Sequence, residues 1–192
     1  MHQLPIRIMV AIALSALLPL AAGAQSIEQK AQLCAACHGD NGIPQQADHP
    51  VIWGQQLGYL FIELRDFKSG ARKNDLMSPI AEALDRADLL PLAQYFSQKK
   101  WPLLQEPPAS AAVAAQAQAA NKSVGCTGCH QDGYLGDSSQ PRLAGQRHDY
   151  LLKTMMDFRT GARGNNPGMT DLMKATPEAD LVALATCLAG LQ

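Results

Sequence analysis

The strongest constraint on this chain is that it repeats itself. The motif Cys34-Ala-Ala-Cys37-His38 recurs about 90 residues later as Cys126-Thr-Gly-Cys129-His130. Two further segments recur at nearly the same offset. A Pro-x-x-x-Gly-Gln segment lies at residues 50–55 and again at 141–146. An Asp-Phe-Lys/Arg-x-Gly-Ala-Arg segment lies at residues 66–72 and again at 157–163. A match this long predicts that the chain is a duplicated domain.

The boundary between the copies is predicted from proline. Residues 101–110 contain Pro102, Pro107 and Pro108, which stop helices and favour an extended connector. We expect a first domain at 25–101, a Pro-rich linker at 102–110 and a second domain at 111–192. Each domain has only about 80 residues, a size that usually needs a disulfide, a metal or a large cofactor for stability.

The first 24 residues predict a secretory signal peptide. An apolar run follows Arg7, and small residues end it at Ala22-Gly23-Ala24, where cleavage after Ala24 is expected. An uncleaved anchor is the alternative, but the run is short for a membrane span and contains Pro19. The mature protein is therefore expected to be exported and periplasmic.

The mature chain reads as all-α. Apolar residues recur at helical spacing, and no long stretch alternates with the period of a strand. We expect helices near residues 27–36, 57–68, 85–99, 109–121 and 148–158, a last helix that opens at Thr176-Pro177, and turn-rich loops at 39–54, 70–76 and 161–168.

Three chemistries use paired cysteines of this spacing. A dithiol redox motif usually lies in a βαβ unit, and none is predicted here. Zinc is a second possibility, but it leaves the adjacent histidines unused. Covalent haem uses every residue: the thiols of Cys34 and Cys37, or Cys126 and Cys129, form thioethers, and His38 or His130 binds the iron. We therefore expect two covalently bound haem c groups.

The second axial ligand is predicted by comparing the two copies. Met77 follows His38 by 39 residues, and Met169 follows His130 by the same distance. Met155 and Met173 lack this match and are expected to fill the core, and His49 is the less favoured alternative in the first half. Met77 and Met169 are therefore the expected axial ligands.

Supporting residues are predicted with the ligands. The carbonyls of Pro50 and Pro141 are candidates to accept a hydrogen bond from the histidine Nδ1–H. Arg72 and Arg163 are read either as partners of the haem propionates or as exposed charges. Cys187 is expected to be a buried apolar thiol.

An iron with both axial positions filled offers no site for a substrate, so outer-sphere electron transfer is the expected role. The near-neutral charge, with 16 basic and 17 acidic side chains, argues against a nucleic-acid partner. Two alternatives stay open. One is a dihaem enzyme, such as a peroxidase or sulfur-compound dehydrogenase, with one iron open; the other is an electron-relay subunit of a larger dehydrogenase.

On these motifs, nearly the whole mature chain resembles the dihaem cytochrome c4 family of bacterial periplasmic electron carriers. The resemblance implies two tandem class I cytochrome c domains about a pseudo-twofold axis, with haem propionates near their interface. It also implies redox protein partners: a quinol-oxidising complex or dehydrogenase as donor and a terminal haem–copper oxidase as acceptor. Some members resembling this chain associate with the membrane.

Overall fold

The computed structural model describes residues 25–191. The predicted signal peptide, residues 1–24, lies outside the described residues. Within 25–191 the regular structure is helical, and the only β-type pairing is an isolated bridge between Asp137 and Gln140. None of the described helices has the length and apolar character needed to cross a membrane.

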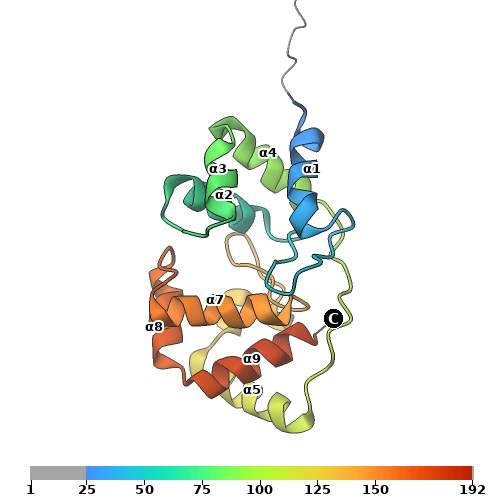
Figure 1. Ribbon diagram of the computed structural model, residues 1–192. Coiled ribbons are helices and arrows are strands. Elements are labelled where there is room, and N and C mark those ends of the chain that lie inside the picture. Colours follow the sequence, from blue (N-terminus) through green and yellow to red (C-terminus); the bar gives the residue numbers. More distant parts are fainter. Residues whose placement is uncertain (1–24, 192) are drawn as a thin grey trace, which may run out of the picture.

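The helices fall into two groups along the chain (Figure 1). The first group contains α1 (Ile27–His38), α2 (Leu57–Ser69), α3 (Met77–Ala83) and α4 (Arg86–Ser97). The second contains α5 (Ala111–Val124), α6 (Thr127–His130), the 3-10 turn η1 (Asp132–Tyr134), α7 (His148–Thr160), α8 (Pro167–Ala175) and α9 (Glu178–Ala189). The all-α prediction is confirmed.

Three short helices, α3, α6 and α8, were not predicted. Residues 161–168 were expected to be a loop, but α8 already begins at Pro167, where the Asn166 side chain accepts a hydrogen bond from Met169 N. In the first half, the Asn74 side chain accepts from the backbone N–H of Met77, the first residue of α3. In the second copy Asn166 is itself the N-cap, whereas in the first copy Asn74 lies two residues before the N-cap Leu76 and also accepts from Leu76 N.

Each group has its own apolar core. In the first, α1 packs on α4 and α2 packs on α3 and α4, around buried residues such as Leu60, Leu92 and Phe96. In the second, α5 packs on α9 and α7 packs on α8 and α9, around Leu151, Phe158, Leu181, Leu184 and others. The same packing in both halves follows from the duplicated apolar pattern.

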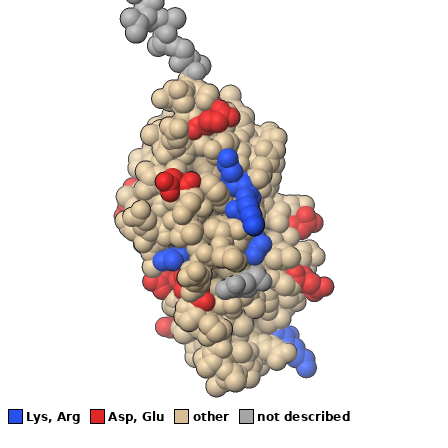
Figure 2. All heavy atoms as spheres, turned by 90° about the vertical axis from the view of Figure 1, so that its right-hand side faces the viewer, with Lys and Arg blue, Asp and Glu red and all other residues tan. Residues whose placement is uncertain are grey.

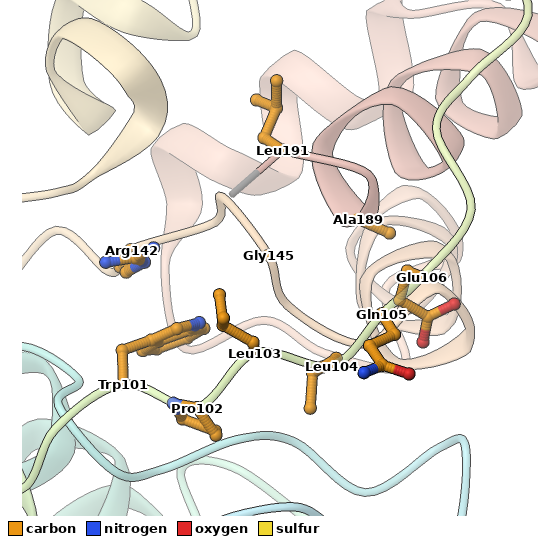
Figure 3. A pocket seen from close by; sticks show the side chains of 10 residues that line it. All are labelled: Trp101, Pro102, Leu103, Leu104, Gln105, Glu106, Arg142, Gly145, Ala189 and Leu191. Carbon is orange, nitrogen blue, oxygen red and sulfur yellow. The ribbon is translucent and has the colours of Figure 1, made fainter.

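The segment from residue 100 to 110 has no helix or strand and runs along one side of the molecule, beside the C-terminus (Figure 1). It packs on the second half, where it lines a small crevice of about 10 Å³ with Arg142, Gly145 and Leu191 (Figure 3). The Arg142 guanidinium lies 4.5 Å from the centre of the Trp101 ring. The Pro-rich segment is therefore extended and fixed against the protein.

In each repeated Gly-Gln segment, the glycine backbone lies against the backbone of the last helix in the same half. Gly54 N donates to Phe96 O on α4, and Gly145 N donates to Leu188 O on α9, both over 2.9 Å. Both glycines have positive φ, +66° and +69°. A Cβ at Gly145 would lie 2.9 Å from Leu191 O, so this position needs glycine for its φ and for its space.

We predict that Gly145→Ala lowers the free energy of unfolding by about 3 kcal/mol, because it adds a backbone clash to the cost of a positive φ. Gly161→Ala is the matched control, since Gly161 has φ +82° but a Cβ added there would meet no atom within 4 Å. It should cost only about 1 kcal/mol. Urea unfolding of both variants measures the difference; equal losses would show that the close approach at Gly145 is unimportant.

Candidate haem sites

In the first half, the last turn of α1 carries all three residues of the first motif. Ser26 caps the start of this helix through a capping box with Gln29. At the other end Cys34 is half-buried, Cys37 is exposed and His38 is buried. Neither Cys34 nor Cys37 is paired in a disulfide.

The second motif is presented by a shorter element. After α5 ends at Gly125, Cys126 precedes the single turn α6, and this turn contains Cys129 and His130. Cys126 is half-buried, Cys129 is exposed and His130 is buried, the same pattern as in the first half. The two motifs therefore present their thiols and imidazoles alike, although one ends a long helix and the other does not.

Both motif histidines are held by a proline carbonyl. His38 Nδ1 donates to Pro50 O over 2.8 Å, and His130 Nδ1 donates to Pro141 O over 2.9 Å. Both predicted hydrogen bonds are thus confirmed. Burial lowers the pKa of both histidines, and the carbonyl partner opposes this in part. With Nδ1 protonated and bonded, a neutral imidazole keeps its Nε2 lone pair for a metal.

The cysteine environment agrees better with haem than with zinc or dithiol exchange. Burial raises the pKa of the Cys34 thiol to about 11, and it also raises the pKa of Cys126. Disulfide exchange uses the thiolate, which a raised pKa disfavours. Among residues 25–191, no three His, Cys, Asp or Glu side chains gather as a metal-ion site would require. The donor set fits covalent haem: two thiols and a positioned imidazole in each half.

The methionines separate into two kinds. Met155 and Met173 are buried, with 8% and 2% exposure, and belong to the second core, as predicted. Met77 begins α3 and Met169 is the third residue of α8, so both lie at the starts of short helices rather than in loops. Both are half-buried, and Met169 packs against the second core.

His49 is a poor alternative to Met77. Its ring centre lies 6.2 Å from that of His38, and its Nδ1 is bonded to the Asp48 carboxylate. It directly precedes Pro50, whose carbonyl contacts Nδ1 of His38. His49 is therefore the chain neighbour of the residue that binds Nδ1 of His38, and one of its own ring nitrogens is already bonded.

Arg72 and Arg163 meet between the two halves. Arg72 pairs with Glu63 over 2.6 Å, and Arg163 pairs with the other oxygen of the same carboxylate. Both arginine side chains are largely buried, with 13% and 6% exposure, so the expectation that they are exposed charges is wrong. Glu63 was missed, because the repeat gave no signal: the corresponding residue in the second half is Thr154.

Tyrosines complete this interdomain cluster. The hydroxyls of Tyr59 on α2 and Tyr150 on α7 lie 3.4 Å apart, and Arg72 donates to Tyr150. Burial raises the pKa of Tyr59. Burial also acts to raise the pKa of Tyr150, but the guanidiniums of Arg72 and Arg163 outweigh it and lower that pKa. The equivalent positions of the repeat thus occupy different electrostatic environments.

We predict that Glu63→Gln lowers the free energy of unfolding by about 3 kcal/mol, because it leaves two buried guanidiniums without their shared carboxylate. Glu82→Gln on the exposed surface of α3 is the control and should change it by less than about 0.5 kcal/mol. Denaturant unfolding of the haem-loaded protein makes the comparison. Equal stability of the two variants would mean that the cluster does not hold the halves together.

Known proteins resemble this chain in both sequence and structure. No protein-family model matches the chain. Cytochrome c4 of Pseudomonas aeruginosa is 30% identical, and the alignment covers 100% of both chains. The crystal structure of reduced cytochrome c4 from Pseudomonas stutzeri superposes with a TM-score of 0.76 at 30% identity, covering 88% of this chain and 100% of that one.

A protein with a different name is also similar. The thiosulfate dehydrogenase electron acceptor of Stutzerimonas stutzeri is 31% identical over 84% of this chain and 80% of its own length. The full-length match to cytochrome c4, the all-α fold and the two Cys-x-x-Cys-His motifs agree with one another. The chain belongs to the cytochrome c4 family of dihaem electron-transfer proteins, which carry two covalently bound haem c groups.

Proposed function

We propose a complete ligand set for each haem. In the domain at 25–101, Cys34 and Cys37 hold the porphyrin, and His38 and Met77 bind the iron. In the domain at 111–192, Cys126, Cys129, His130 and Met169 take the same roles. The equal His-to-Met spacing and the position of both methionines in the first turn of a short helix, α3 or α8, support this assignment.

The function that follows is outer-sphere electron transfer without substrate chemistry. Bound haem supplies a one-electron Fe(III)/Fe(II) couple. The protein's part is to fix each imidazole through its Nδ1–H and to offer a thioether, which stabilises ferrous iron and raises the reduction potential. The single observation that carries this proposal is the duplicated hydrogen bond from a buried histidine to a proline carbonyl.

We also propose that the interdomain cluster serves the haems. Arg72 and Arg163 share one carboxylate, Glu63, while Asp66 is paired with Arg65 and Asn165. Counting Arg65, whose side chain is 55% exposed, three guanidiniums face two carboxylates here. Buried haem propionates would balance the excess through charge-assisted hydrogen bonds, and this would bring the two haem edges near the same interface.

The partners are redox proteins. We propose a quinol-oxidising complex or a dehydrogenase as the donor and a terminal oxidase as an acceptor. The similarity to a thiosulfate dehydrogenase electron acceptor favours one second candidate, a relay that takes electrons from a dehydrogenase. On the face carrying the linker, Lys and Arg side chains form a short line with acidic side chains around it (Figure 2), so both signs of charge are offered to a partner.

We propose that the protein works in the periplasm after removal of residues 1–24. Intact-mass measurement of the protein purified from its native host should give a chain that starts at Gln25 and carries two haems. Retention of Met1 to Ala24 in the haem-loaded protein would contradict cleavage and would favour an N-terminal anchor.

The axial assignment predicts an asymmetric result for two methionines of α8. Met169→Ala should open the second iron: about half of the reduced haem should then bind carbon monoxide, and about half of the sulfur-to-iron charge-transfer absorption should disappear. Met173→Ala is the control, because Met173 is a buried core residue one turn further along the helix. It should destabilise the fold by about 2–5 kcal/mol but leave both irons closed. If Met173→Ala opens the iron and Met169→Ala does not, the assignment is wrong.

A further inference from the structure

Two glutamines make matching contacts across the interface between the halves. Gln146 Oε1 accepts from Val51 N over 2.8 Å, and Gln146 Nε2 donates to Val51 O over 3.0 Å. Gln55 does the same with Arg142, over 2.7 Å and 3.0 Å. Each glutamine therefore binds both polar groups of one backbone residue in the opposite half.

Neither amide is free to turn. Gln55 and Gln146 are buried, with 3% and 2% exposure. Each Oε1 also accepts from the backbone N–H of the next residue, Gln56 or Arg147, at the start of α2 or α7. A rotation of the amide would set its NH₂ group against two N–H donors, so the oxygen and nitrogen positions are fixed by their partners.

The backbone residues that the two glutamines bind lie next to the prolines that accept a hydrogen bond from the motif histidines. Val51 follows Pro50, whose carbonyl accepts from His38, and Arg142 follows Pro141, whose carbonyl accepts from His130. The amide of the second half thus fixes the backbone that orients the imidazole of the first half. In the same way, the Gln55 amide of the first half fixes the backbone that orients the His130 imidazole of the second half.

Resting on the proposed ligand set, we propose that Gln146 is a positioning residue for the His38 imidazole and Gln55 for the His130 imidazole. Each domain thereby adjusts the reduction potential of the haem in the other. The effect passes through the Nδ1–H···O=C bond, because a well-aligned bond raises the basicity of the imidazole and stabilises ferric iron. Loosening the carbonyl weakens this effect and favours ferrous iron.

Ordinary interface adhesion is the competing explanation, and other contacts illustrate it. Gln56 Nε2 donates to Leu135 O and Gly136 O of the opposite half, and Tyr59 N donates to Ser138 O. These bonds join the halves without touching Val51, Arg142 or the two prolines. If the glutamines only hold the halves together, substituting one of them should shift the reduction potentials of both haems equally. The proposed positioning predicts instead that a substitution in one half shifts the potential of the haem in the other half.

The test uses the haem-loaded full-length protein and the variants Gln146→Leu and Gln55→Leu, each the control for the other. A redox titration followed by NMR of the haem methyl resonances gives one potential per haem, with Met77→Ala and Met169→Ala used to assign the resonances. Gln146→Leu should shift the redox equilibrium of the first haem toward ferrous iron by about tenfold, equivalent to about 59 mV for one electron. The second haem should shift by less than about twofold. Gln55→Leu should give the reverse pattern.

Gln56→Ala serves as an adhesion control and should shift neither haem by more than about twofold. Where a leucine variant does not retain haem, Gln146→Asn and Gln55→Asn replace it, since they keep the amide and only shorten its reach. Equal shifts in both haems, a shift in the haem of the variant's own domain, or no shift would each overturn the proposal. The proposed ligand set fails separately, through a wild-type spectrum that lacks two low-spin irons.

Discussion

The structure depends on the burial of two imidazoles that each donate one hydrogen bond to a main-chain carbonyl. A buried histidine without a partner for Nδ1 would be costly, and one free to rotate would make a poor metal ligand. The bonds from His38 to Pro50 and from His130 to Pro141 solve both problems. They also explain why each half carries a long turn-rich segment between its first and middle helices. This segment has to fold back so that its proline carbonyl reaches the motif histidine.

The two halves are copies, but they are not independent. The Gly-Gln pair of each repeat first brings the segment close to its own C-terminal helix, through Gly54 and Gly145. It then reaches across to the other half, through Gln55 and Gln146. Duplication makes such reciprocal contacts easy to form, because one surface patch meets its own copy around a twofold axis. Glu63 breaks the symmetry by pairing with an arginine from each half.

Much of this could be predicted from sequence because the repeat acts as an internal comparison. Comparing the two copies identified the motif residues, distinguished Met77 and Met169 from the other methionines and located most helices. The helices α3 and α8 were missed, since they are short and begin inside segments rich in turn residues, where an asparagine side chain accepts from the backbone at each start. The pairing of Arg72 and Arg163 with Glu63 could not be predicted, because contacts between halves depend on docking and Glu63 has no copy. The repeated glutamines could be recognised in the sequence, but their hydrogen-bond partners could not. These partners are main-chain atoms, which every residue type carries.

We propose that both irons are saturated by the protein and exchange only electrons. A potentiometric titration of the wild-type protein with quantification of its haem, followed by optical and paramagnetic resonance spectra, tests it most directly. We expect two haems per chain, each low-spin in the ferric and ferrous states, and two one-electron steps that account for all of the iron. One haem per chain, or a high-spin signal from either iron in the resting protein, would contradict the account.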